Sequence, residues 1–235
     1  MRSLVGAWRV ARVLVHGLHG LAIVLWRFPS YAAPARHARI QWWSAKLLRC
    51  MGLALHIEGV APRAGAKLVV CNHVSWLDIA AVHAVIPEAH FVSKSDVKHW
   101  PLVGKLVAGA GTLFIEREKK RDALRVVHQM AEALQRGDTV AVFPEGTTGD
   151  GRVLLPFHAN LLQAAVATAT PVQPVLLRFF DRAHVVSPVA EFLGETTLAQ
   201  SLWRFVCAEG LSIEVRVLPP QGTEHADRRA LAGHL

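Results

Sequence analysis

Residues 68–78 read LVVCNHVSWLD, and this stretch decides how the rest of the chain is organised. The first five residues, Leu68 to Asn72, have the length and β-branching of a buried strand. Ser75 and Asp78 are residue types that commonly begin a helix. His73 is therefore expected where a strand ends and the backbone turns, which in an α/β protein is where side chains line a crevice.

The histidine and the aspartate of this stretch, His73 and Asp78, are separated by four residues. Asp78 is expected to hold one ring nitrogen of His73 and leave the other free to accept a proton. Such a pair is two-thirds of a hydrolase triad, but no activated serine is apparent. The pair therefore suits a reaction in which the hydroxyl of the substrate attacks. Taken alone, the spacing also fits a histidine at a turn and an aspartate that caps a helix.

Three further segments accompany this motif. GTLFIER at residues 111–117 is a glycine turn, a strand and a terminal arginine, and FPEGT at residues 143–147 follows an apolar strand at 139–142. PVQPV at residues 171–175 is a proline-containing strand. In this order and spacing, the segments resemble the blocks of the glycerolipid acyltransferase family, typified by 1-acylglycerol-3-phosphate acyltransferases. The resemblance covers residues from about 55 to 180.

The resemblance implies transfer of a fatty acyl chain from an acyl thioester to the sn-2 hydroxyl of lysophosphatidic acid, which gives phosphatidic acid. His73 would be the general base and Asp78 its orienting partner. The donor would be a thioester of coenzyme A or of acyl carrier protein, with no cofactor and no metal. The residues expected to bind substrate are Lys94 and Arg117 for the phosphate, and Glu145, Gly146 and Thr147 for the rest of the acceptor.

The chain departs from the family pattern directly after FPEGT. The family commonly has arginine and serine there, whereas residues 148–152 read TGDGR. One basic group near the acceptor head is therefore missing. If Arg152 or Arg117 supplies that charge, lysophosphatidic acid is the favoured acceptor. The alternative is another lysolipid, because Thr148 resembles the residue of acyltransferases that esterify lyso-ornithine lipid, a zwitterionic acceptor without phosphate.

Other classes of function stay open on the sequence alone. One is a noncatalytic, membrane-anchored lipid-binding protein, and another is a thioesterase or lipase that uses water. The absence of a G-x-S-x-G sequence argues against the lipase. Cys71 could share a strand face with His73 and act as a thiol nucleophile, although a buried small hydrophobic residue is the simpler interpretation.

The charge of the chain is concentrated at its N-terminus. The net charge is +8, yet eight basic residues and no acidic residue precede Glu58, while the remainder holds 18 of each sign. Four of the seven tryptophans also lie in this first quarter. Tryptophan among basic residues fits nucleic acid or an anionic membrane. Since the residues between them are apolar, we expect membrane lipids as partners and no nucleic acid.

The uncharged stretch at 13–26 has 14 residues, which span about 21 Å as a helix. A bilayer core needs about 20 residues, so an interfacial helix on the cytoplasmic face of the cytoplasmic membrane fits better than a span. A signal peptide with cleavage near residues 31–33 is the rival interpretation. The three cysteines are widely spaced and the thirteen histidines form no H-x3-H set, so we expect a reducing compartment and no metal site.

The sequence predicts two parts, a membrane-associating helical segment at residues 1–53 and an acyltransferase domain at 54–235. The first part is expected to hold helices at 13–26 and about 38–55. In the second, strands are expected at 53–57, 68–72, 89–92, 112–116, 139–143, 172–178 and 213–217, and helices at about 78–85, 122–136 and 157–168. This alternation predicts an α/β fold with a mixed, largely parallel sheet flanked by helices.

Overall fold

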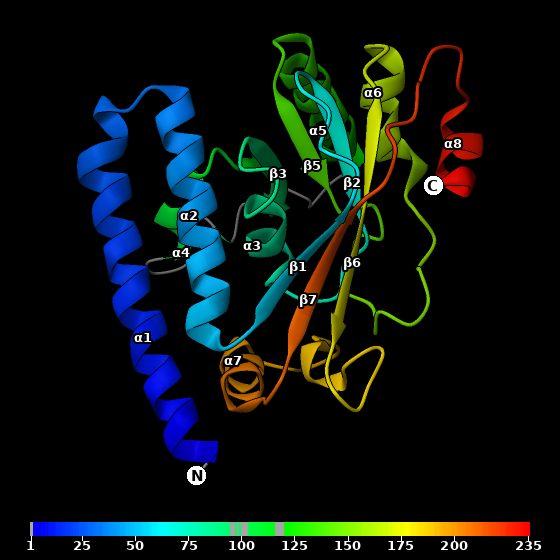
Figure 1. Cartoon of the computed structure of the whole chain (residues 1–235). Helices are drawn as coiled ribbons and strands as arrows, with labels where there is room; N and C mark the ends of the chain where they lie inside the picture. The colour runs from blue at the N-terminus through cyan, green and yellow to red at the C-terminus, as the bar shows by residue number, and fades with distance from the viewer. Residues whose placement is uncertain (1, 95–96, 98, 100–102, 116–119) are drawn as a thin grey trace.

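A computed structural model describes residues 2–94, 97, 99, 103–115 and 120–235 (Figure 1). The strands are β1 (Ala54–Gly59), β2 (Lys67–Cys71), β3 (Ala89–Lys94), β4 (Leu113–Ile115), β5 (Thr139–Val142), β6 (Val172–Phe180) and β7 (Ser212–Val217). They form one seven-stranded sheet in the order β1-β7-β6-β2-β5-β3-β4. Only β6 and β7 pair antiparallel among these neighbours. The expected mixed, largely parallel sheet is confirmed.

The helices cover both faces of this sheet. The α-helices are α1 (Arg2–Ala22), α2 (Ala33–Met51), α3 (Asp78–His83), α4 (Val103–Gly109), α5 (Lys120–Gln135), α6 (Gln163–Ala167), α7 (Leu198–Cys207) and α8 (Arg228–His234). Residues of α2, α3 and α7 pack into one hydrophobic core, and residues of α5, α6 and α8 pack into a second. Figure 1 shows α1 and α2 as a hairpin beside the rest of the molecule.

Strand β2 is buried along its whole length because the two cores lie on its opposite faces. Val69 and Cys71 belong to the core beneath α2, α3 and α7, whereas Leu68 and Val70 belong to the core beneath α5, α6 and α8. Alternate side chains of a strand point to opposite faces, so a strand covered on both sides is apolar except where a polar residue is paired, as Lys67 is with Glu88 at 2.7 Å. The continuous apolar run at 68–71 therefore reflects its central place in the sheet.

The two helices of the N-terminal hairpin begin earlier than the sequence predicts. Helix α1 already begins at Arg2 and continues through a π-helical turn at Ile23–Arg27. Helix α2 begins at Ala33, five residues before the expected start, because Pro34 suits the first turn of a helix. Two hydrogen bonds join the helices: Trp43 Nε1 donates to the His16 carbonyl at 3.1 Å, and His16 Nε2 lies 2.9 Å from the Trp43 carbonyl.

Two further differences separate the prediction from the structure. The helix expected at 157–168 is a short 3-10 turn at Ala159–Leu162 followed by α6, because the amide of His158 donates to the Pro144 carbonyl at 2.8 Å instead of entering a helix. Helices α4, α7 and α8 were not predicted. The start of α7 carries a recognisable signal, a capping box in which Thr197 and Gln200 bond each other's backbone.

Candidate active site

The proposed catalytic residues lie where strands β2 and β5 end. These strands are parallel neighbours, so their carboxyl ends meet at one edge of the sheet. Asn72, directly after β2, exchanges two hydrogen bonds with the backbone of Leu177 in β6, at 2.9 and 2.7 Å. This amide extends the pairing of β2 with β6 by one residue and fixes the point at which the chain turns towards His73.

His73 and Asp78 make the contact that the sequence predicts. His73 Nδ1 lies 2.8 Å from Asp78 Oδ2, and the same oxygen accepts from the amides of Val74 at 2.7 Å and Ser75 at 2.9 Å. A carboxylate only accepts, so Nδ1 must carry the proton that it donates to Asp78. Nε2 of His73 is therefore left as an acceptor. The side chain of Asp78 is fully buried, whereas 19% of the His73 side chain is exposed.

Glu145 joins the two loops that carry the site. Its Oε1 accepts from the amide of His73 at 2.9 Å, and its Oε2 accepts from the amide of Leu155 at 3.3 Å. Burial raises the pKa of Glu145, and these two amide bonds oppose that shift. The structure thus brings Glu145 to His73, a contact that was not predicted, and both of its oxygens already accept from backbone amides. Its expected contact with acceptor hydroxyls stays a prediction.

The imidazole of His73 also packs against an aromatic ring. The ring of Phe143 is stacked on it with 4.0 Å between centroids, and Phe91 is stacked on Phe143 at 5.3 Å. The amide of Gly149 donates to the His73 carbonyl at 2.8 Å. The orientation of His73 is therefore fixed by its ring, its amide and its carbonyl, which leaves the ring little freedom to turn away from Asp78.

The FPEGT turn brings its glycine close to a second histidine. Gly146 has a φ of +72°, and a Cβ at this position would lie 2.9 Å from His158 Nε2, so the turn requires glycine. Gly146 and Thr147 are both exposed beside Glu145. The backbone is therefore accessible at this turn, which fits their expected role in substrate binding without testing it.

A cavity of about 130 Å³ opens beside His73. It is lined by Asn72, His73, Val74, Glu145, Gly151, Arg152, Val153, Leu154 and Leu176. Leu154 and Leu176 also line a neighbouring apolar hollow that reaches Leu218 and Leu235. His73 thus faces a space with polar groups at one side and apolar groups at the other.

The remaining expected residues differ in what can be said of them. Arg117 lies outside the described residues. Lys94 is the last residue of β3, and its side chain lies outside the described part. Cys71 is fully buried in the core, and burial, with the charge of Asp78 as a smaller cause, raises the pKa of its thiol well above the usual value. Cys71 is therefore a core residue, and the thiol nucleophile considered from the sequence is wrong.

The sequence did not predict which side chains contact Arg152 and His73. Glu191 pairs with Arg152, and Phe143 stacks on His73, although 39 and 70 residues separate the members of these pairs. No local spacing signals such contacts. Among the described residues, no group of three or more histidine, cysteine, aspartate or glutamate side chains could hold a metal ion.

Comparison with known proteins agrees with this geometry. A family model described as acyltransferase matches residues 53–178. A lyso-ornithine lipid O-acyltransferase of Pseudomonas aeruginosa is 36% identical over 95% of this chain and 88% of its own length. A 1-acyl-sn-glycerol-3-phosphate acyltransferase of Neisseria gonorrhoeae is 38% identical over 78% of this chain and 72% of its own.

The fold is also that of a solved structure. The crystal structure of the 1-acyl-sn-glycerophosphate acyltransferase from Thermotoga maritima superposes with a TM-score of 0.72, covering 100% of this chain and 94% of that one at 19% identity. At that identity the likeness concerns the fold alone. The family match and the relatives decide the assignment: the chain belongs to the acyltransferase family, and it is an acyltransferase of the lysophospholipid type.

Proposed function

We propose that the chain transfers a fatty acyl group from an acyl thioester to a hydroxyl of a lysolipid, with His73 as the general base. The observation that carries this proposal is the 2.8 Å contact between His73 Nδ1 and the buried Asp78, beside a cavity that His73 lines. Nε2 takes the proton of the acceptor hydroxyl while its oxygen attacks the thioester carbonyl. The tetrahedral intermediate then expels the thiolate, which takes the proton from His73.

The acyl donor in this proposal is a thioester of coenzyme A or of acyl carrier protein. A thioester already carries a good leaving group, so the reaction requires no covalent enzyme intermediate and no cofactor. Asp78 stabilises the imidazolium that forms when His73 is protonated, because its carboxylate is buried and bonded to Nδ1. The apolar hollow beside Leu154 and Leu176 suits the first methylenes of an acyl chain.

Two lysolipids are candidates for the acceptor. Lysophosphatidic acid is the acceptor favoured by the sequence, and its phosphate needs a positively charged partner. Of the three basic candidates, Arg152 is already held by two carboxylates. The side chains of Lys94 and Arg117 lie outside the described part. Lyso-ornithine lipid is favoured by the paired state of Arg152 and by the Pseudomonas relative, which matches 95% of the chain. Both acceptors share the reaction at His73.

An acyl-transfer assay tests the function. Purified protein is given a radiolabelled acyl thioester and a panel of lysolipids that includes lysophosphatidic acid and lyso-ornithine lipid, in detergent micelles. Label is expected in the diacyl product of at least one of the two. Hydrolysis of the thioester without transfer would instead indicate a thioesterase, and binding of lysolipid without either reaction would indicate a noncatalytic lipid-binding protein.

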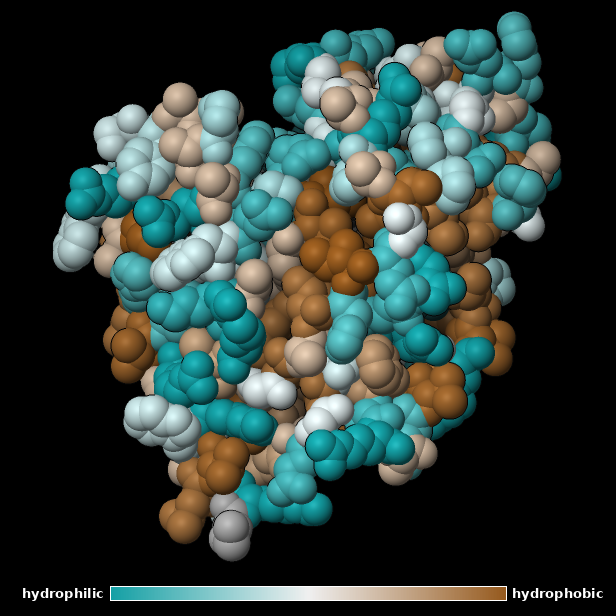
Figure 2. All heavy atoms as spheres, in the orientation of Figure 1, coloured by the Kyte–Doolittle hydropathy of each residue, from teal (hydrophilic) through white to brown (hydrophobic). Residues whose placement is uncertain are grey.

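We further propose that α1 lies in the cytoplasmic face of the membrane as a monotopic anchor. The segment Arg2–Ser30 is long and apolar enough to be a candidate span, with a mean hydropathy of 1.3 over its most apolar 18 residues. A stripe of its side chains is exposed at helical spacing, namely Leu4, Trp8, Val15 and Leu18. Figure 2 shows hydrophobic residues along the outer edge of the region of α1. Such a face has no partner in water and suits lipid.

A contact on the opposite side of α1 argues for an interfacial helix and against a span. The guanidinium of Arg9 donates to the carbonyls of Val206 and Ala208 at 2.9 and 2.7 Å. These carbonyls belong to the C-terminal end of α7, where a cation is favoured. Because Arg9 ties α1 to the domain, the helix cannot cross a bilayer without breaking this contact.

Liposome flotation tests the anchor with a matched pair of variants. Trp8→Ser with Leu18→Ser removes two side chains that are 66% and 61% exposed on α1. Leu124→Ser with Val185→Ser removes two that are 75% and 72% exposed elsewhere. On anionic liposomes, the first pair is expected to lower the bound fraction at least ~10-fold and the second to leave it unchanged. Equal binding of both variants would rule out α1 as the anchor.

A further inference from the structure

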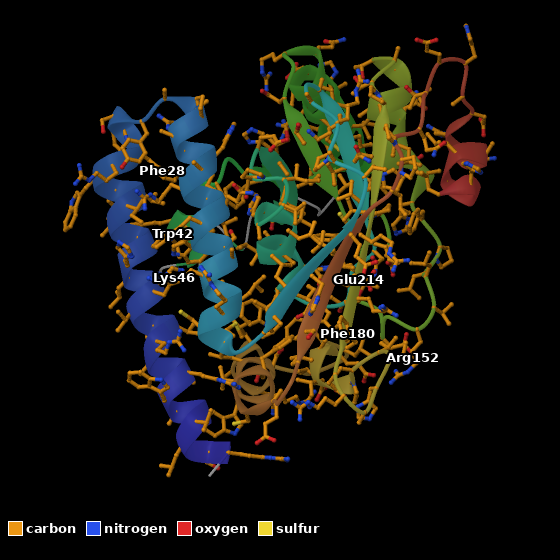
Figure 3. The ribbon with its side chains drawn as sticks, in the orientation of Figure 1. Phe28, Trp42, Lys46, Arg152, Phe180 and Glu214 are labelled. Carbon is orange, nitrogen blue, oxygen red and sulfur yellow. The ribbon has the colours of Figure 1, made fainter. Side chains whose placement is uncertain are left out.

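Arg152 lines the cavity beside His73, yet its charge is already shared. Its Nη1 lies 2.7 Å from Glu191 Oε1 and 3.5 Å from Asp150 Oδ2. For Nε and Nη2 of Arg152, no partner is recorded among the described residues. A ligand in the cavity would therefore meet a guanidinium whose Nη1 is held by two carboxylates, while Arg152 itself lines the cavity (Figure 3 labels Arg152).

The turn that carries Arg152 is built to hold this side chain in place. The amide of Arg152 donates to Asp150 Oδ1 at 2.8 Å, which closes a turn through Gly151. Gly151 has a φ of +77°, and a Cβ there would lie 3.2 Å from the Val74 side chain in the loop after His73. The turn thus packs directly against the loop of the general base, which places Arg152 at the wall of the same cavity.

Thr148 brings the second carboxylate to Arg152. Its hydroxyl donates to the carbonyl of Phe192, the residue next to Glu191. The loop at 148–152 is therefore tied to the segment at 191–192 at two points, Thr148 to Phe192 and Arg152 to Glu191. Thr148 stands where the resemblance expects an arginine. Position 148, which has no positive charge in this chain, thus holds in place the segment that carries the negative charge of Glu191.

We propose that the Arg152–Glu191 pair, positioned by Thr148, selects a lysolipid acceptor with a zwitterionic headgroup that carries one carboxylate and one ammonium. This inference rests on the proposed acyl transfer and decides between its two acceptors. The free nitrogens of the Arg152 guanidinium present a fork that matches the carboxylate. Glu191 and Asp150, which hold Nη1 of the same guanidinium, would supply the negative charge for the ammonium.

A phosphate monoester fits this pair less well. It carries up to two negative charges and no positive one, and it would approach two carboxylates that already share Arg152. The hydrogen bond from the backbone amide of Arg152 holds the pKa of Asp150 below its usual range, and the side-chain hydrogen bond to Glu191 raises the pKa of Arg152, so both groups are ionised near neutral pH. Like charges disfavour the phosphate, and a zwitterion avoids that cost because each half meets an opposite charge.

A competition assay tests the selection. Lyso-ornithine lipid and lysophosphatidic acid are offered at equal surface concentration with one acyl thioester, and the ratio of their kcat/KM values is measured. Wild-type protein is expected to prefer lyso-ornithine lipid. Glu191→Gln removes the negative charge that neutralises Arg152, although the amide oxygen can still accept, and should move the ratio ~10-fold towards lysophosphatidic acid. Arg152→Gln should lower kcat/KM for lyso-ornithine lipid by ~10-fold.

Two further variants separate selection from damage to the fold. Thr148→Val keeps the shape of the side chain but cannot donate to Phe192, so it should move the ratio in the same direction as Glu191→Gln. Glu195→Gln and Arg182→Gln remove exposed charges that form no ion pair among the described residues, and they should leave the ratio unchanged. Melting curves check that each variant is folded.

The outcomes distinguish the selection from the function on which it rests. A wild-type preference for lysophosphatidic acid, or a ratio that stays within twofold in folded Glu191→Gln protein, overturns the selection and leaves acyl transfer intact. Absence of transfer to every lysolipid by wild-type protein overturns the proposed function itself. A ratio that moves in both Glu191→Gln and Thr148→Val, but in neither control, supports the pair as the selecting element.

Discussion

Two histidines near the ends of α3 have different environments although they share one aromatic stack. His73, before the helix, lies against Phe143, which is stacked on Phe91, and His83, the last residue of the helix, meets Phe91 edge-on at 5.2 Å. His73 bonds a carboxylate and is partly exposed, whereas His83 bonds the carbonyl of Ala89 at 2.9 Å and is 5% exposed. Burial lowers the pKa of His83 to about 4.

The difference between them shows what makes an imidazole useful as a base. A backbone carbonyl can hold a ring nitrogen but carries no net charge to stabilise the protonated ring. A buried carboxylate does so, and an exposed second nitrogen can reach a substrate. We therefore expect the partner and the exposure, and not the residue type, to decide that His73 acts as the base and His83 does not. Variants at each end of this stack test that distinction.

The largest effect is expected from His73→Ala. Removal of a general base typically lowers the rate by ~10²–10⁴-fold, and the side chain contributes little to the core because it lies at the cavity. The measurement is kcat for acyl transfer, with the circular-dichroism spectrum as a check on folding. His128→Ala, an exposed histidine on α5, is the control. Turnover near the wild-type rate in folded His73→Ala protein would exclude His73 as the base.

Asp78→Asn should follow, with a loss of ~10²-fold or more in kcat. The amide has no charge to stabilise the imidazolium, and its nitrogen cannot accept from the amides of Val74 and Ser75 that now bond Oδ2. The split between kcat and KM separates this role from loss of structure, since a lost partner for the imidazolium should lower kcat and leave KM nearly unchanged. A rise in KM together with a lower melting temperature would point to a structural role alone.

A smaller effect is expected from Glu145→Gln, because the glutamine side chain has one hydrogen-bond-accepting oxygen where the carboxylate has two. Either the His73 amide or the Leu155 amide then loses its partner, which costs about 1–3 kcal/mol. We expect kcat to fall ~10-fold with a lesser change in KM, because Glu145 positions the base. The exposed Glu132→Gln on α5 is the matched control. A rise in KM with kcat intact would favour the direct substrate contact predicted from the sequence.

The smallest effect on activity is expected from His83→Gln. This variant should change the pH dependence of stability. The pKa of His83 is lowered from 6.5 to about 4, so as pH falls below 6.5 the unfolded chain binds a proton that the folded chain refuses until about pH 4. Stability therefore falls with falling pH across that window, by at most ~1.4 kcal/mol per unit. The variant should remove this slope and keep kcat at neutral pH within about twofold.

Urea unfolding at several pH values measures that slope. Burial also lowers the pKa values of His16 and His37, so the wild-type curve contains more than one histidine. The difference in slope between wild type and His83→Gln gives the contribution of His83 alone. Identical slopes for the two proteins would mean that His83 is charged or solvated in the folded state, and the contrast with His73 would then be lost.

Much of the fold was predictable because its signals are local. The strand at 68–72 and the amphipathic helix at 122–136 each follow from neighbouring residues. The pairing of His73 with Asp78 is local too, since five positions of one turn bring the two side chains together. The helix at 157–168 was mispredicted because its first residues are held by the FPEGT turn, which is remote in sequence.

By itself, then, the sequence determined the α/β class, the His73–Asp78 pair and the basic, apolar N-terminus, all of which depend on short-range spacing and composition. The tertiary structure alone decided that Glu145 holds the amide of His73, that Phe143 stacks on its ring, and that Glu191 meets Arg152. These contacts join segments that are 72, 70 and 39 residues apart. The order of the strands in the sheet brings such segments together, and no local periodicity encodes that order.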